Sequence, residues 1–95
     1  MVTHVVLIKL KEPSSDHIET VVRKIRDLVG KIDVLKSMEV GADIVRSERS
    51  YDVALIARFE NMADLRTYNT HPSHLPVLDY VRSLASSMAA VDFES

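Results

Sequence analysis

Residues 2–10 carry the sequence VTHVVLIKL, and this stretch decides the fold. Successive side chains of a β-strand point to opposite faces, so the stretch divides into two sets. The sets are Val2, His4, Val6, Ile8 and Leu10 on one face and Thr3, Val5, Leu7 and Lys9 on the other. Because both sets are mainly apolar, we expect a strand that is covered on both faces.

The rest of the chain alternates between helical and strand patterns. Apolar residues recur every three to four positions from Ile18 to Ile32, which predicts a helix that begins at an Asp16–Glu19 capping box and ends around Gly30. A second helix, capped by Asn61, must end near residue 70 or 71 because Pro72 follows. The other expected elements are strands at 35–44, 51–60 and 88–94, an exposed turn at 46–50, and a helix from 76 to about 86.

This order of elements predicts an α+β fold. We expect a ferredoxin-like, four-stranded antiparallel sheet with its helices on one face, in a single domain over residues 1–95. The helices can cover only one face of such a sheet, although its first and third strands are apolar on both. We therefore expect a homodimer, a dimeric α+β barrel, in which a second copy buries the exposed sheet face.

Composition excludes several classes of function. The 95 residues carry a net charge of −2, which gives no electrostatic reason to bind nucleic acid. The longest apolar run, Val5 to Ile8, is far shorter than the roughly 20 residues that span a bilayer, so no membrane association is expected. The chain has no cysteine, hence no disulfide or cysteine-ligated zinc, and we expect it in the cytoplasm.

Polar residues that could carry chemistry gather around the predicted helix break. Tyr68, His71 and His74 lie in one seven-residue segment that includes Pro72. The ends of helices and strands place side chains within reach of ligands. His4 is the one polar residue on its strand face, so it must find a partner inside the protein or line a cavity.

The chain resembles the stress-responsive A/B barrel (Dabb) family over nearly its whole length. The most specific part of the resemblance is the His-Pro-x-His segment after Tyr68, together with the histidine of the first strand. The matching segments are 3–11, Gly41, 51–52, 59–60, Leu65, Tyr68, 71–74 and 91–94.

The resemblance implies a homodimeric barrel with a cavity between each sheet and its helices. One plant member of the family is a cofactor-free polyketide cyclase that acts by intramolecular aldol condensation. Carried over by motif, its catalytic histidine falls on His74 and its tyrosine on Tyr68, while His4 takes the place of a further cavity histidine. His74 would remove a proton next to a ketone, and Tyr68 would hold the substrate oxygen as charge develops.

The chain departs from the cyclase at the cavity wall. Val53 stands where the cyclase has a histidine, and Val22 and Ile25 stand where it has aromatic residues. We therefore expect a drier cavity of different shape, and we do not expect activity on an aromatic polyketide.

The leading hypothesis is a homodimer that binds a compact apolar or aromatic molecule near His4, Tyr68 and His74. The residues expected to contact the ligand, besides the catalytic candidates Tyr68 and His74, are His4, Val6, Ile8, Val22, Ile25, Val53 and His71. One alternative is a cofactor-free lyase, cyclase or isomerase, with His74 as general base and Tyr68 as hydrogen-bond donor. Another is a structural or regulatory dimer whose cavity is filled with side chains.

The same histidines and tyrosine also have possible structural roles. The His71 ring could cap the free carbonyl groups of the preceding helix, and Tyr68 and His74 could satisfy buried backbone groups. No metal is expected, because no cysteine or carboxylate lies close to His71 and His74 in the sequence. No cofactor is expected either, since the only two glycines cannot form a phosphate-binding loop.

Overall fold

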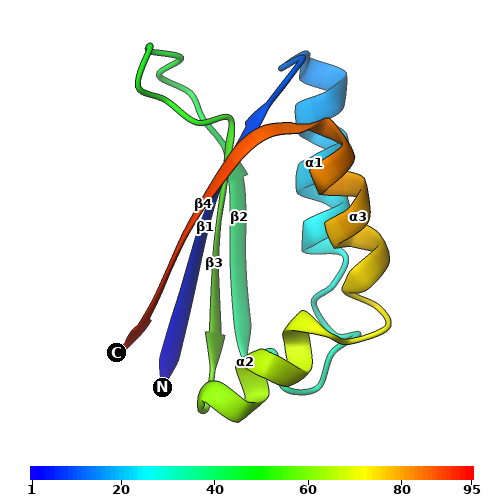
Figure 1. The fold of residues 1–95 in the computed structure, drawn as a ribbon, viewed down its shortest axis with the longest axis vertical. Coiled ribbons are helices and arrows are strands. Elements are labelled where there is room, and N and C mark those ends of the chain that lie inside the picture. Colours follow the sequence, from blue (N-terminus) through cyan, green and yellow to red (C-terminus); the bar gives the residue numbers. More distant parts are fainter.

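Strand β1 (Val2–Leu10) lies inside a four-stranded sheet in the computed structural model, which describes residues 1–95. β3 (Val53–Phe59) and β4 (Ala85–Glu94) pair with β1 on its two sides, and β2 (Ser37–Ala42) pairs with β3. All pairings are antiparallel and the order is β2-β3-β1-β4, as Figure 1 shows. Helical segments connect β1 to β2 and β3 to β4, so the predicted ferredoxin-like α+β fold is confirmed.

Three helices lie on one side of the sheet. α1 (Ser15–Arg26) and α3 (Leu75–Leu84) run alongside each other over one face, and the short α2 (Met62–Asn69) lies near one end of the layer between sheet and helices (Figure 1). The core lies between the two layers, where Val21 and Ile25 of α1 are buried together with Ile8 of β1. Phe59 and Tyr68 extend this core toward α2.

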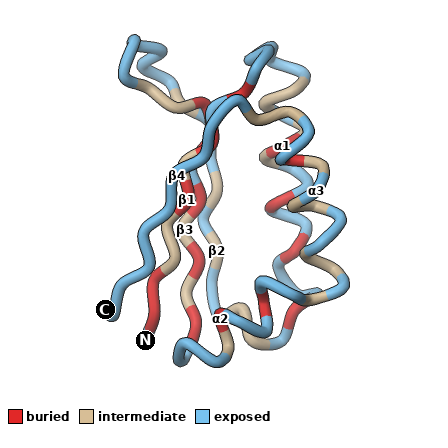
Figure 2. The backbone as a smooth tube through the Cα atoms, in the orientation of Figure 1, coloured by how far each residue is buried: buried red, intermediate tan, exposed pale blue.

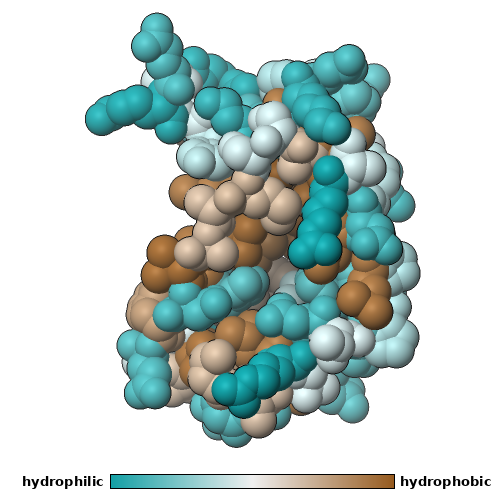
Figure 3. All heavy atoms as spheres, viewed as in Figure 1, coloured by the Kyte–Doolittle hydropathy of each residue, from teal (hydrophilic) through white to brown (hydrophobic).

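The opposite face of the sheet has no helix over it. In the centre of this face Val5 lies opposite Ile56 and Val91. β4 is exposed over most of its length, as Figure 2 shows, and Val91 and Phe93 are 61% and 47% exposed. Figure 3 shows hydrophobic side chains gathered over the strands. One face of the sheet is therefore apolar and uncovered, as the two-sided pattern of residues 2–10 predicts.

The first helix begins and ends earlier than its sequence pattern suggests. Its N-cap is Ser14, whose hydroxyl accepts a hydrogen bond from the His17 N–H at 3.2 Å, so the predicted capping box at Asp16 is wrong. The helix ends at Arg26 and turns follow it to Gly30, whose φ of +86° suits glycine. Apolar spacing alone misled here, because Leu28 and Ile32 are buried in the turns after the helix.

The second strand is shorter than expected at both ends. Predicted over residues 35–44, β2 covers only Ser37–Ala42, and Ile44 is 92% exposed. Residues 43–52 form an arm that projects from the top of the sheet in Figure 1. The arm leaves the strand direction because the Asp43 carboxylate accepts a hydrogen bond from the Arg46 N–H, which holds Arg46 at a φ of +57°.

The last helix passes directly into the last strand. α3 was predicted to extend to about Ser86 and the strand to begin at Met88, but β4 already begins at Ala85. The backbone carbonyl of Leu84 accepts a hydrogen bond from the Lys11 N–H at 2.9 Å, which ties this junction to the end of β1. β1 and β4 then pair to their other ends, where the Ser95 N–H donates to the Met1 carbonyl at 2.9 Å.

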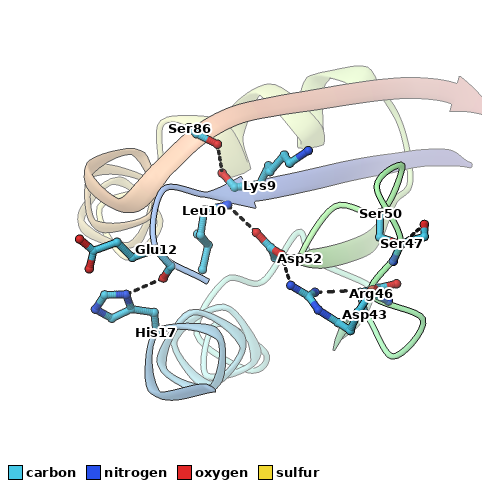
Figure 4. Close-up of polar contacts among 10 residues, drawn as sticks. All are labelled: Lys9, Leu10, Glu12, His17, Asp43, Arg46, Ser47, Ser50, Asp52 and Ser86. Carbon is cyan, nitrogen blue, oxygen red and sulfur yellow. Dashed lines mark hydrogen bonds and ion pairs between the residues drawn. The ribbon is translucent and has the colours of Figure 1, made fainter. Parts of the chain in front are cut away.

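A buried carboxylate joins the arm to the central strand (Figure 4). Asp52 is 4% exposed, and its two oxygens accept hydrogen bonds from the Leu10 N–H and from the Arg46 guanidinium, each at 2.7 Å. Burial by itself would raise the pKa of Asp52, but these two hydrogen bonds and the nearby charges of Arg46 and Lys9 lower it below its usual value. Asp52 is therefore a structural carboxylate that stays ionised.

We expect Asp52→Ala to lower the free energy of unfolding by about 2 kcal/mol, because it leaves the buried Leu10 N–H without an acceptor. For a domain of this size, the melting temperature measured by circular dichroism should fall by about 8 to 16 °C. Asp43→Ala, which removes a partner of the same arginine in the arm, should cost less than about 1 kcal/mol.

Asp52→Ala should also remove part of the acid sensitivity of the protein. A carboxylate with a lowered folded-state pKa contributes stability above its unfolded pKa, near 3.8, and this contribution disappears as pH falls through the folded-state pKa. Equal acid transitions for the wild type and Asp52→Ala would contradict this assignment.

Candidate functional site

A cavity of about 450 Å³ lies between the sheet and the helices and extends along α3 from its junction with α2. In Figure 3 the molecule is hollowed between its strands and its helices. Most of the lining is apolar and comes from β1, α3 and β4, with Ile25 and Leu28 closing the α1 side. Its polar side chains are few, and three of them belong to histidine and tyrosine residues that the sequence singles out.

Tyr68 stands at the centre of the polar group. Its ring lies between Phe59 and His74, with centroid distances of 5.0 and 4.3 Å, and the residue is 1% exposed. Burial raises the pKa of Tyr68 to about 12, so its hydroxyl is protonated at neutral pH. Because the residue lines the cavity, that hydroxyl is available as a hydrogen-bond donor to a bound molecule.

His74 is placed by the helix break that Pro72 causes. It directly precedes α3, and its Nδ1 lies 3.1 Å from the backbone carbonyl oxygen of Asn69 at the end of α2. A carbonyl oxygen only accepts, so Nδ1 carries the proton in this hydrogen bond. In the neutral ring, Nε2 therefore keeps its lone pair and can act as a base.

The surroundings of His74 favour this neutral form. Burial is the largest effect and lowers the pKa of His74, while the hydrogen bond to the Asn69 carbonyl opposes the decrease. Electrostatic interactions with His4, Arg82 and His71 lower the pKa of His74 further. The ring is consequently uncharged at neutral pH, which is the state that a general base requires.

His4 completes a row of three rings across the cavity. It projects from β1, and its ring centroid lies 6.3 Å from that of Tyr68 at an interplanar angle of 66°. Its Nδ1 contacts the Asp92 carboxylate of β4, the residue opposite it in the strand register. His4 thus has a polar partner and also lines the cavity, so both roles expected of it are found together.

The structure brings six of the predicted site residues together and places three elsewhere. The cavity is lined by His4, Val6, Ile8, Ile25, Tyr68 and His74. Val22 faces a shallow groove between α1 and β2, and Val53 is buried at the arm end of β3. These two do not line the cavity, because it lies toward α3 and β4 rather than toward β2.

His71, the third residue outside the cavity, has a local structural role. Its Nδ1 accepts a hydrogen bond from the Ser73 N–H at 3.0 Å, which stabilises the turn between α2 and α3. The alternative that the His71 ring caps the preceding helix is wrong, because the imidazole that bonds a carbonyl at the end of α2 is that of His74. His71 thus stabilises the turn, and His74 caps the helix.

Two residues were not identified from the sequence: Arg82, which lines the cavity, and Asp92, which contacts the cavity residue His4. Asp92 was noted only as part of the closing segment, although its alternation with Ala90 and Met88 puts it on the helix-facing side of β4. Arg82 follows His74 and Leu78 at intervals of four residues, the spacing of one helix face. These periodicities could have identified both residues once the end of α3 was placed correctly.

Nowhere do three or more His, Cys, Asp or Glu side chains come together in a way that could hold a metal ion. None of the helices combines the length and apolar character needed to cross a bilayer.

The chain was then compared with known proteins. The family model described as Stress responsive A/B Barrel Domain matches residues 2–95. A dimeric protein of unknown function with a ferredoxin-like fold from Bacteroides fragilis is 30% identical, with a TM-score of 0.84 over 99% of this chain and 95% of that chain. A dimeric ferredoxin-like protein of unknown function from Thermobifida fusca is 26% identical, with a TM-score of 0.89 over 99% and 90%.

The similar structures include proteins that are named for an activity. Hydroxynitrile lyase from Passiflora edulis has a TM-score of 0.84 and covers 97% of this chain and 90% of its own. The two chains are 16% identical, so this likeness shows the fold alone. Among curated proteins, none matches the chain.

Proposed function

Because the chain belongs to the stress-responsive A/B barrel (Dabb) family, we propose that it is a cytoplasmic homodimer that binds a compact apolar or aromatic molecule. The observation that carries this proposal is the apolar cavity beside His4, Tyr68 and His74. Its volume of about 450 Å³ falls within the 300 to 1,000 Å³ typical of small-molecule sites. A cavity of this size favours ligand binding over a structural dimer whose interior is filled.

The proposed homodimer is supported by the uncovered face of the sheet. Val5 and Leu7 of β1, with Val91 and Phe93 of β4, form an apolar surface that no element of the chain covers. Burying such a surface against an identical one is favourable by roughly 25 cal/mol per Å² before the costs of association. The related proteins of Bacteroides fragilis and Thermobifida fusca are described as dimeric.

A specific observation also favours catalysis as a second candidate function. The base and the donor are side by side, since the rings of His74 and Tyr68 are 4.3 Å apart and have the protonation states this chemistry needs. In this cofactor-free lyase, cyclase or isomerase, Nε2 of His74 takes a proton from the carbon next to a carbonyl group. The Tyr68 hydroxyl donates to the oxygen that becomes an enolate.

We expect the neutral fluorophore N-phenyl-1-naphthylamine to bind in the cavity. Titration should show an increase in fluorescence that saturates at one site per chain. Ala90→Phe, which puts a ring into the cavity from β4, should abolish the increase. Ala63→Phe, on the exposed surface of α2 and outside the cavity lining, should leave it unchanged. Equal binding by both variants would contradict a ligand site in this cavity.

We expect the wild type to sediment as a dimer at micromolar concentration. Leu7→Glu places a charge in the middle of the apolar sheet face, where burial without a partner is costly, and should give monomers. Val29→Glu, an exposed apolar residue in the turns after α1, is the matched control and should remain dimeric. A monomeric wild type, or a dimeric Leu7→Glu, would overturn the proposed assembly.

The catalytic candidate predicts exchange of α-protons of a ketone such as phenylacetone in D₂O, followed by NMR. His74→Ala should slow exchange about a hundredfold or more, and Tyr68→Phe about tenfold. The rate should fall as pH decreases through the lowered pKa of His74, below the ordinary value of 6.5, because the base becomes protonated there. Exchange no faster with the wild type than with His74→Ala would leave ligand binding without catalysis.

A further inference from the structure

The cavity differs in charge from the chain as a whole. The sequence has 14 acidic and 12 basic residues, yet no Asp or Glu side chain lines the cavity. Its ionisable groups, apart from Tyr68, are His4, His74 and Arg82. Asp92 on β4 contacts the cavity residue His4, so its carboxylate already has a partner. The lining is therefore able to attract negative charge and offers none of its own.

Arg82 is the permanent cation of this lining. It lies in the last turn of α3 at the solvent-exposed edge of the cavity, and it makes no ion pair with any carboxylate of the chain. Asp79, one turn earlier on the same helix, does not pair with Arg82 either. A guanidinium that lies at the edge of an apolar cavity and has no internal partner is suited to bind an anionic group of a ligand.

The spacing of residues along α3 sets the distance between His74 and Arg82. His74, Leu78 and Arg82 follow one another at intervals of four residues, so they share one side of the helix. Eight residues correspond to a rise of roughly 12 Å. A molecule held by Arg82 at one end therefore passes along the apolar wall and presents its other end to His74 and Tyr68.

We propose that the ligand is a monocarboxylic acid with an apolar body, whose carboxylate pairs with Arg82. This inference rests on the proposed small-molecule site and names the class of molecule it takes. A carboxylate fits the single planar guanidinium, which can donate two parallel hydrogen bonds to it. A phosphate group would carry a second charge and several more acceptor oxygens, for which the lining offers no further permanent cation.

The test compares 4-phenylbutanoate with 4-phenylbutanamide, which have the same size and differ in charge. Isothermal titration of the full chain should show the acid binding at least about tenfold more tightly than the amide. Arg82→Gln should weaken the acid about tenfold and leave the amide unchanged, while Arg82→Lys should weaken the acid less. Arg66→Gln, an exposed arginine on α2 outside the cavity, is the control and should change neither affinity.

The outcomes separate this inference from the proposal on which it rests. Equal affinity for acid and amide, or equal loss of both in Arg82→Gln, would overturn the role of Arg82 while leaving a neutral ligand site intact. If the wild type bound neither of these two compounds nor N-phenyl-1-naphthylamine, both proposals would be overturned. Circular dichroism of each arginine variant establishes that a lost affinity does not result from unfolding.

Discussion

The apolar character of both faces of the central strand governs this structure. β1 presents Val6 and Ile8 to the helices and Val5 and Leu7 to the opposite side. The helices cover only the face with Val6 and Ile8. They cover it incompletely, because a cavity remains between them and the sheet. The same strand therefore underlies both functional surfaces, with His4 directed into the cavity and its neighbours in the sequence directed to the proposed dimer interface.

The cavity depends on the way α2 ends. Pro72 stops the helix, and the turn that follows allows His74 to bond the free Asn69 carbonyl while its ring packs against Tyr68. One hydrogen bond thus caps a helix and sets the tautomer of the proposed base. Structural and catalytic accounts of His74 are for this reason compatible, and loss of stability in a variant does not by itself argue against a chemical role.

Periodicity and helix-breaking residues were enough to predict the fold class and the order of the elements. The two-sided apolar pattern of residues 2–10 and the Asn61 and Pro72 signals correspond to β1 and α2 as observed. Element ends were less predictable, because burial continues beyond α1 in Leu28 and Ile32. A local hydrogen bond at Asp43 and a tertiary one at Leu84 decide where β2 and α3 end.

The site was predictable where residues lie on β1 or beside Pro72, and less so where packing decides. Val22 and Val53 are apolar and occupy the expected elements, but the position of α3 directs the cavity away from them. Asp92 could be placed only with the register of β4 against β1, and Arg82 only with the orientation of α3 about its axis. A single sequence specifies both poorly.

The pairing of β1 with β4 affects how the protein folds. Met88 and Ala90 of β4 complete a cavity wall that Val6 and Ile8 of β1 begin, although the two strands lie far apart in the sequence. Contacts of such large sequence separation form late and slow the search for the native state. Until β4 has paired with it, β1 is an open edge of the sheet, and the cavity is one of the last features to form.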